Sequence, residues 1–312
     1  MVGRRGGAGE NRRLFSWWVV SLSPDTCSTE ELPDLLGNLN TEFVYSRGRS
    51  MGIEHRFPGV MNLATNFFVQ RQGGKIASAL AVKRFTWMTP SATFAGAMLG
   101  MVWTTPSQRG RGLAKKNLLA ARLAMLAEGR DFMVLWTTRP DIYSGSGWLA
   151  ADHGLYGALE TTGDQGVKEP TNRNVGVDLY RRDFAQIETI RERLLPRISR
   201  EAGVALPIPF PATMLRTFVA SQAYAIVGFN GDEAFVLDLD GDPLSMVTLW
   251  LRLQASARKI HVNVATNSMA ERYLTALNVP LSCKPLAMWA PLSTRANDLD
   301  FSSIYIPFLD RI

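Results

Sequence analysis

A short segment in the first half of the chain combines two glycines with four basic side chains. Residues 109–115 read Arg-Gly-Arg-Gly-Leu-Ala-Lys, and Lys116 follows them. A diphosphate is bound by several converging backbone N–H groups, and a glycine-rich turn at a helix N-terminus supplies such groups within a favourable dipole. Gly110 and Gly112 have no side chain that would keep the backbone away from a phosphate, and the neighbouring basic residues supply positive charge. The segment therefore predicts a site for a diphosphate-bearing ligand.

A simpler interpretation of the same residues is a tight turn between a strand and a helix. A nucleotide P-loop is excluded, because the Lys-Ser/Thr pair of such a loop is absent after Gly112. The candidate ligand-binding residues of the loop are Arg109, Gly110, Arg111, Gly112, Leu113, Ala114 and Lys115.

The patterns on either side of the loop predict the elements that position it. Residues 94–105 are rich in strand-forming residues and lead into the loop. Residues 115–128 carry leucines at helical spacing and stop at Gly129. The continuously apolar run Phe132–Trp136 is typical of a central strand that is covered on both faces. We expect this strand to lie parallel to the strand before the loop.

With these elements in place, two motifs resemble those of a known family. Residues 102–114 are similar to the acetyl-CoA signature of the GNAT superfamily, which has a strand, a proline and Arg/Gln-x-x-Gly-x-Gly/Ala at a helix start. Arg109, Gly112 and Ala114 stand at the defining positions. Residues 143–148, Tyr-Ser-Gly-Ser-Gly-Trp, are similar to the Tyr-x-x-x-Gly-Phe segment of the same family, with Trp in place of Phe. The order of the motifs indicates a GNAT-type N-acetyltransferase.

The resemblance implies roles for individual residues. Acetyl-CoA would be the co-substrate, with its pyrophosphate held by residues 109–115. Val102, Trp103 and Thr104 would line a strand that separates from its neighbour and pairs with the pantetheine arm. Tyr143 matches the tyrosine that often protonates the departing CoA thiolate. The implied reaction is direct attack by an amine of a small molecule or peptide in a ternary complex.

The general base is left open by these motifs. An amine is largely protonated at neutral pH, so another group must take its proton before attack. Glu54 and His55 lie between the first predicted helix and the hairpin, although ordinary surface positions are the simpler interpretation for both. The carboxylate at Ile312 follows an apolar segment and could also reach a cleft.

The elements recur in the same order in both halves of the chain, which predicts an internal duplication with a boundary near residue 182. The first unit is expected to contain strands or strand pairs at 15–22, 66–71, 76–87, 94–105, 132–136, 154–160 and 174–181, and a helix around Leu32–Leu39. The second unit is expected to contain helices at 183–202, 243–256 and 267–277, and strands at 224–229, 234–239, 260–265 and 282–290. The predicted fold class is α/β with mixed (α+β) sheets, arranged as two tandem GNAT-like domains.

The predicted domains are therefore a catalytic unit at 14–182 and a degenerate copy at 183–312, after a disordered basic extension at 1–13. In the second unit the segment that corresponds to the loop reads Asp-Leu-Asp-Gly-Asp-Pro at 238–243. Its acidic residues would repel a diphosphate, and Pro243 removes a backbone donor. We expect this copy to bind no CoA, and an acidic calcium-type loop is the weaker alternative.

Composition excludes several classes of protein. Hydrophobic residues make up 46% and charged residues 20% of the 312 residues, which is ordinary globular composition. No stretch approaches the roughly 20 apolar residues that a membrane span requires. Half of the net charge of +6 lies in residues 1–13, so the remaining chain is only mildly basic, which argues against a nucleic-acid partner. Cys27 and Cys283 lack metal-type spacing and the three histidines are scattered, so we expect no metal, no disulfide framework and a cytoplasmic location.

Two other functions stay open. A tandem-GNAT aminoacyl transferase that uses a charged tRNA would suit the basic net charge, but such relatives generally lack an intact pyrophosphate loop. A non-enzymatic module that binds acyl-CoA or RNA would need no reactive Tyr143. A comparison of thermal stabilisation by acetyl-CoA and by RNA distinguishes these alternatives.

Overall fold

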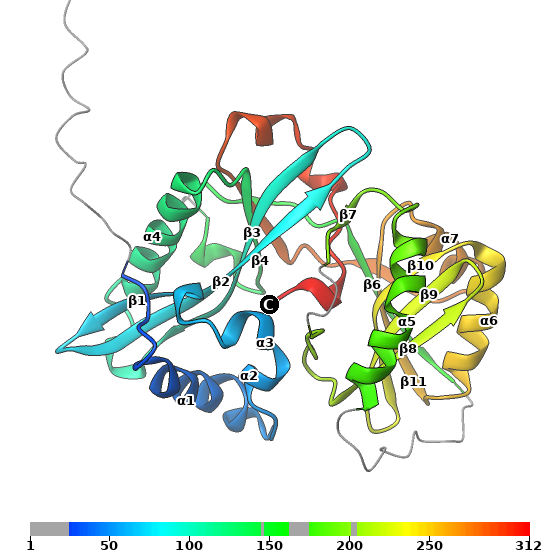
Figure 1. The fold of residues 1–312 in the computed structure, drawn as a ribbon, viewed down its shortest axis with the longest axis horizontal. Coiled ribbons are helices and arrows are strands. Elements are labelled where there is room, and N and C mark those ends of the chain that lie inside the picture. The colour runs from blue at the N-terminus through cyan, green and yellow to red at the C-terminus, as the bar shows by residue number, and fades with distance from the viewer. Residues whose placement is uncertain (1–24, 145–146, 162–174, 201–204) are drawn as a thin grey trace, which may run out of the picture.

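The chain folds into two lobes, each built around a β-sheet, and its C-terminal end lies between them (Figure 1). The computed structural model describes residues 25–144, 147–161, 175–200 and 205–312, with the backbone alone for 175–182. The predicted fold class, mixed sheets with helices, is confirmed. The extension at 1–13 and the strand expected at 15–22 lie outside the described residues.

The first sheet contains the predicted hairpin and the predicted parallel pair. Strands β1, β2 and β3 are antiparallel neighbours, and β4 lies parallel to β3. The order across the sheet is β1-β2-β3-β4-β13-β5, and β7 pairs with the far end of β2. Its strands are β1 (Phe67–Gln72), β2 (Lys75–Met88), β3 (Thr93–Thr104), β4 (Phe132–Trp136), β5 (Leu149–Ala150), β7 (Arg197–Ile198) and β13 (Ala287–Pro291).

The second sheet repeats this succession. Strands β8, β9 and β10 are antiparallel neighbours, and β11 lies parallel to β10 over four residue pairs, as β4 does to β3. Its strands, in order across the sheet, are β12 (Leu281–Cys283), β6 (Gly154–Glu160), β11 (Lys259–Ala265), β10 (Glu233–Gly241), β9 (Ala223–Asn230) and β8 (Met214–Ala220).

Each sheet is completed by a strand from the other half of the sequence. β6 lies in the second sheet, where it pairs with β11 along its whole length, and β13 lies in the first sheet beside β4. The expectation that residues 154–160 close the first unit is therefore wrong, and a boundary near residue 182 does not separate the two sheets. An alternating apolar pattern specifies which face of a strand is buried but does not specify the sheet that it joins.

Other expected elements also differ. The strand expected at 174–181 is not formed, because residues 175–181 lie in helix α5 (Val175–Arg191). Ile187 and Ile190 recur at helical spacing on one face of this helix and are buried against the second sheet. The helix ends ahead of Pro196. The strand expected at 282–290 is two strands, β12 and β13, in different sheets. Strand β8 was not predicted at all.

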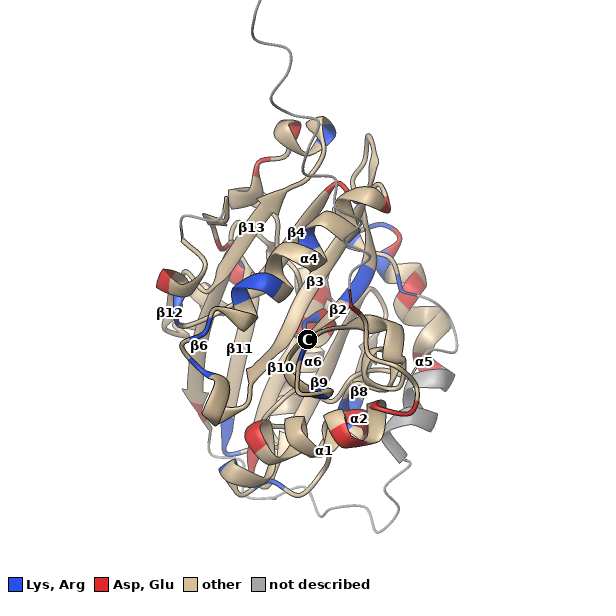
Figure 2. Ribbon diagram, turned by 90° about the vertical axis from the view of Figure 1, so that its left-hand side faces the viewer, with Lys and Arg blue, Asp and Glu red and all other residues tan. Residues whose placement is uncertain are grey.

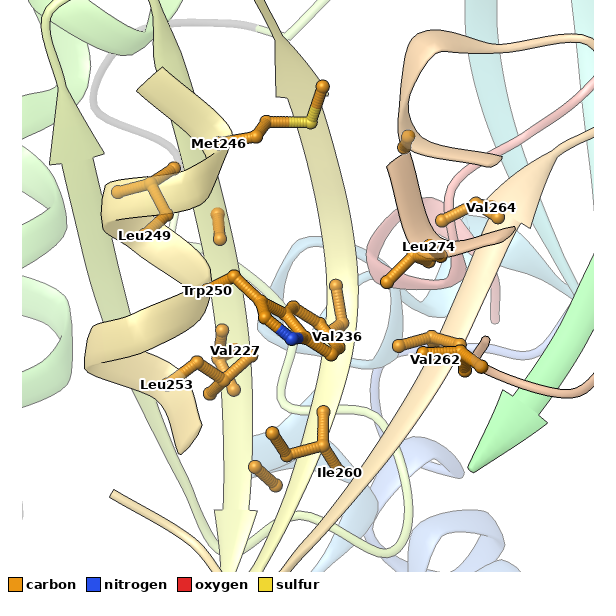
Figure 3. Packing of buried hydrophobic residues seen from close by; sticks show 14 of the residues in the cluster. Val227, Val236, Met246, Leu249, Trp250, Leu253, Ile260, Val262, Val264 and Leu274 are labelled. Carbon is orange, nitrogen blue, oxygen red and sulfur yellow. The ribbon is translucent and has the colours of Figure 1, made fainter. Parts of the chain in front are cut away.

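The longer helices pack apolar residues against the two sheets. The described helices are α1 (Leu32–Phe43), α2 (Ile53–Arg56), α3 (Pro58–Met61), α4 (Leu113–Ala127), α5 (Val175–Arg191), α6 (Pro243–Gln254) and α7 (Met269–Ala276). Short 3-10 turns lie at Tyr45–Arg47, Ala64–Asn66, Pro106–Gln108, Pro140–Ile142, Thr294–Asp298, Phe301–Ser303 and Phe308–Asp310. Figure 3 shows α6 directing Trp250 and Leu253 toward the strands that carry Val227 and Val236.

Helix α4 buries a different face from the one that its leucines suggest. Leu119, Leu123 and Leu126, which recur at helical spacing, are 56%, 42% and 48% exposed. The face that packs on the first sheet carries smaller and polar residues, including the fully buried Ala121 and Asn117. Small side chains let the helix lie close to the strands, so the leucine spacing identified the helix but not its buried side.

A buried ion cluster joins the lobes. The Arg200 guanidinium donates to both carboxylate oxygens of Asp310 at 2.9 and 2.6 Å and lies 2.8 Å from Asp238 Oδ2 on β10. The Tyr224 hydroxyl donates to the same Asp238 oxygen at 2.9 Å. Opposite charge and hydrogen bonds from Arg200 keep the pKa of Asp310 below its usual value although burial opposes this. The cluster therefore fixes the last residues of the chain against the second sheet.

Candidate active site

The predicted loop has the backbone conformation that its glycines permit. Gly110 and Gly112 have φ angles of 78° and 74°, and Gly112 is the N-cap of α4. No atom of the described residues lies within 4 Å of the position that a Cβ would take on either glycine. Positive φ is costly for residues that have a Cβ, so the turn requires glycine at both positions. The loop thus presents open backbone at the beginning of a helix.

The start of α4 has free hydrogen-bond donors. Within the described part of the chain, no acceptor is recorded for the backbone N–H groups of residues 110–115, and the first turn holds no acidic side chain. Arg111 and Lys115 are exposed and make no ion pair with a described residue. Basic residues of α4 are visible in Figure 2. Free donors, the helix dipole and positive charge together suit a diphosphate.

Arg109 holds the loop rather than pointing into it. Its Nε donates to the Thr104 carbonyl oxygen at 3.1 Å, and its Nη2 lies 3.0 Å from Glu42 Oε2 on α1. Leu113 is 4% exposed and inserts the first turn of α4 into the core. These contacts connect the loop to β3, α1 and the interior. The resemblance assigned Arg109 to the pyrophosphate, and in the structure its side chain connects the loop to β3 and α1.

A polar network stabilises the end of β3. The Ser78 hydroxyl donates to the Trp103 carbonyl oxygen at 2.8 Å and lies 2.9 Å from Thr104 Oγ1. Asn117 Nδ2 on α4 donates to the same Ser78 oxygen at 3.3 Å. Asn117 Oδ1 is buried and has no partner in the described chain. The network connects β2, β3 and α4 at the place where the loop leaves the sheet.

Strands β3 and β4 separate before β3 ends. Their pairing runs from Gly96 with Phe132 to Leu99 with Leu135, whereas β3 continues to Thr104. Met101 has a φ of 50°, and the register of β3 against β2 shifts at the same place. Residues 102–104 therefore have no partner on β4, which itself ends at Trp136. A bulge of this kind redirects the strand and exposes backbone groups on one edge.

The side chains of the separated segment point in alternate directions. Val102 packs with the apolar residues beneath α4, which include Tyr143. Trp103 is 6% exposed and packs in the core that α1 covers. Trp103 is therefore a core residue whose side chain does not reach a site, and its carbonyl oxygen accepts from the Ser78 hydroxyl.

Tyr143 follows the 3-10 turn after β4 and is 7% exposed. Its ring meets Trp148 edge-on, with centroids 6.2 Å apart. Burial raises the pKa of its hydroxyl. None of the described residues hydrogen-bonds this hydroxyl, so it is a donor without a structural partner.

A cavity lies next to β2. It has a volume of about 640 Å³. Strand β1 pairs with β2 only as far as Ala81, and the segment of β7 contacts β2 only from Thr86, so residues 82–85 form an open edge there. The cavity is lined by this edge, by residues 57–60 and 205–207, and by the end of the chain. Neither the glycine loop nor Tyr143 lines it, so the cavity is a second compartment.

The cavity adjoins the separated strands through Ile312. This residue lines the cavity and its backbone contacts Gly100, which comes directly after the last β3–β4 pair. Glu54 and His55 do not line the cavity: Glu54 accepts from Asn40 Nδ2 at 2.8 Å, and the His55 side chain is 74% exposed. Of the three candidates for the general base, Ile312 lines the cavity, and Glu54 and His55 do not.

Sequence reasoning missed the cavity residues Lys83, Arg200 and Asp310. Lys83 falls within a strand-forming run, and Arg200 and Asp310 are separated by more than a hundred positions. A lysine inside the apolar run of β2 was the one available signal, because lysine is rarely buried without a partner.

The geometry agrees with the comparisons with known proteins. Residues 24–151 match the family model described as an acetyltransferase (GNAT) domain. These residues therefore form a domain of the GNAT superfamily, and the resemblance inferred from the two motifs is confirmed. No curated protein matches the chain in sequence.

Solved structures extend the likeness over most of the chain. A GCN5-related N-acetyltransferase from Kribbella flavida shares 15% identity, with a TM-score of 0.62, 87% of this chain covered and 71% of that one. One from Anabaena variabilis shares 15% identity, with a TM-score of 0.64 and coverages of 87% and 73%. A probable N-acyltransferase from Enterococcus faecalis shares 11% identity, with a TM-score of 0.63 and coverages of 87% and 72%. The chain thus has the fold of these proteins in both lobes. None of its described helices is both long and apolar enough to cross a bilayer.

Proposed function

We propose that the protein transfers an acetyl group from acetyl-CoA to an amine of a small molecule or peptide, by direct attack in a ternary complex. The observation that supports this most strongly is the loop at 110–115, with its open glycines and free N–H groups, directly after the strand that leaves β4. The GNAT domain at 24–151 supports acyl transfer as the general chemistry. We expect the reaction in the cytoplasm, in line with the two free cysteines.

The residues of the loop and strand fit the co-substrate. Backbone N–H groups of 110–115, with Arg111 and Lys115 beside them, would hold the pyrophosphate. The unpaired edge at Val102–Thr104 would pair with the amides of the pantetheine arm. When bound, acetyl-CoA supplies an acyl group that is activated as a thioester. This assignment requires no metal.

Tyr143 is the proposed general acid. Its raised pKa keeps the hydroxyl protonated at neutral pH, as a proton donor must be. Because no described residue accepts from it, the hydroxyl is available to a developing negative charge, which would be stabilised more in the transition state than in the ground state. The general base stays unassigned.

The second lobe is proposed to be a degenerate copy that binds no CoA. At the start of α6 the Asp242 carboxylate accepts from the N–H groups of Leu244 and Ser245 at 3.0 and 3.1 Å. The donors that serve a ligand at α4 are therefore occupied at α6, and Pro243 lacks an N–H. We expect one CoA site per chain.

Three measurements test this function. Acetyl-CoA should raise the melting temperature, calorimetry should give one equivalent per chain, and thiol release should depend on an added amine. RNA serves as the comparison ligand. Stabilisation by RNA that salt abolishes, together with no effect of acetyl-CoA, would favour an RNA-binding function and overturn the proposal.

A further inference from the structure

Most of the charged side chains that line the cavity beside β2 are cationic. Four cationic side chains line it, and one carboxylate does so: Lys83, Arg84, Arg130, Arg200 and Asp310. In Figure 2 basic residues lie along the part of β2 that passes the C-terminal end of the chain. Several of these cations already have an anionic partner.

Three carboxylates neutralise most of this charge. Arg84 donates to both oxygens of Glu128 at 2.8 and 2.6 Å, and Arg130 Nε lies 3.6 Å from the same carboxylate. Arg200 donates hydrogen bonds to both carboxylate oxygens of Asp310 and forms an ion pair with Asp238. Each of these three arginines therefore lies within 4 Å of a carboxylate, and one of the four cationic side chains has no ion pair among the described residues.

That charge is located at Lys83. Its Nζ donates to the backbone carbonyl oxygen of Asp310 at 2.6 Å, and no carboxylate of the described residues lies within ion-pair distance of it. Burial lowers the pKa of Lys83, and the nearby Arg200 lowers it further although Asp310 opposes this. Lys83 is partly buried, and a cation that donates only to a neutral carbonyl in such a place is stabilised by an incoming anion.

Two other donors at the cavity are also unused. Arg200 Nη1 and Arg130 Nε are buried and have no hydrogen-bond partner among the residues that the structure describes. The Arg200 side chain is only 6% exposed, so solvent does not compensate for the missing acceptor. Buried donors without partners are uncommon in folded proteins and indicate a group that binds there.

The rest of the lining is apolar. Phe57, Val60, Phe85, Ile198 and Leu206 surround the charged residues. A ligand that fits both parts has an apolar body and one anionic group. A single unpaired cation matches a carboxylate better than a phosphate dianion, which would bring a second negative charge into a buried site.

We propose that the acceptor amine carries a carboxylate and an apolar side chain, as a hydrophobic amino acid does, and that Lys83 binds the carboxylate. This inference rests on the proposed acyl transfer. The contact between Ile312 and Gly100 places the cavity next to the separated strands, where the acyl group would be presented. Lys83 is a binding residue that orients the acceptor, with Arg130 and Arg200 as further donors.

The first test compares hydrophobic L-amino acids with their C-terminal amides as acceptors, by CoA thiol release. The pairs are phenylalanine, leucine, methionine and tryptophan. In the wild type kcat/KM should be at least about tenfold higher for the acid than for the amide of the best pair, a typical size for a charge-assisted contact. Lys83→Met should reduce this ratio to within about twofold, mainly through the KM of the acid.

Lys75→Met is the matched control. Lys75 lies on the same strand, in the exposed hairpin turn, and does not line the cavity. This variant should keep the wild-type ratio. Melting curves check that the variants fold, and Arg130→Met, which removes another donor of the cavity, replaces Lys83→Met if that variant does not fold.

Calorimetry gives a second readout that needs no turnover. The probes are 3-phenylpropanoate and 3-phenylpropanamide, and only the carboxylate should bind, with affinity lost in Lys83→Met. Equal use of acids and amides, or equal binding of the two probes, overturns the inference and leaves the acyl transfer intact. Transfer to no amine at all contradicts the proposed function instead, and carboxylate binding that depends on Lys83 then still supports the anion site.

Discussion

The backbone of Ile312 lies against Gly100, two residues that are more than two hundred positions apart. A Cβ on residue 100 would come within 2.7 Å of the Ile312 carbonyl oxygen. Backbone atoms cannot rotate away as a side chain does, so the last residues of the chain must shift if residue 100 gains a methyl group.

Gly100→Ala should therefore destabilise the protein by about 1–3 kcal/mol, as overpacking does. Thermal or urea unfolding measures this. Gly37→Ala is the matched control, because Gly37 lies inside helix α1 with nothing within 4 Å of the Cβ position. Alanine favours a helix interior, so this variant should gain about 0.5–1 kcal/mol. Equal effects of the two substitutions would contradict the close contact at Gly100.

Gly112→Val should weaken acetyl-CoA binding by about 1–3 kcal/mol, because a side chain blocks the approach to the free N–H groups and distorts the turn. Gly129→Val is the control for the conformational strain that a valine suffers at a positive φ angle. Gly129 lies just beyond the other end of α4 with a φ of 73° and equally open surroundings. Both variants should lose stability, and calorimetry should find weaker acetyl-CoA binding only for Gly112→Val. Unchanged affinity in that variant would mean that the loop is only a turn.

Tyr143→Phe should lower kcat by about 10²–10⁴-fold with acetyl-CoA affinity nearly unchanged, since one acid–base group typically contributes this much. The structure adds a second expectation. The hydroxyl has no partner among the described residues, so its removal leaves no unsatisfied group and the melting temperature should stay close to that of the wild type. Steady-state kinetics and a melting curve decide the matter, and a kcat within about threefold of the wild type would eliminate Tyr143 as the acid.

Asp240 should make stability depend on pH. Burial, reinforced by the charge of Asp238, raises the pKa of Asp240 from 3.8 to about 6, although a hydrogen bond from the Gly241 N–H opposes the rise. Between pH 4 and 6 the folded state keeps a proton that the unfolded state has lost, so this residue's contribution to stability falls as the pH rises through that window. Asp240→Asn removes the titration and keeps an oxygen to accept from Gly241.

Above pH 6 the Asn variant should therefore be more stable than the wild type by about 2–3 kcal/mol, and below pH 4 the two should be similar. Urea unfolding from pH 4 to 8 measures the free energy of unfolding of both proteins. The other carboxylates contribute equally to both, so their contributions cancel in the difference. A difference that does not change with pH would show that Asp240 has an ordinary pKa.

The sequence alone determined the features that depend on neighbours along the chain. The glycines of the loop, the continuous apolar run of β4 and the helix pattern after the loop each follow from local conformational preference. The strand patterns at 94–105 and 132–136 therefore predicted the parallel strand pair, and residues 109–128 predicted the turn and the helix that follow; the structure contains these elements. The repeat of elements in the second half was predicted for the same reason.

Only the tertiary structure decided which strands share a sheet and which charges share a cavity. β6 and β13 have similar short apolar patterns, and their exchange between the sheets depends on long-range pairing that such patterns do not encode. Lys83 and Asp310 meet because the end of the chain returns between the lobes, and the neighbouring carboxylates form their ion pairs with arginines rather than with Lys83. Charge balance in a buried site is set by distances in three dimensions, which composition and spacing do not specify.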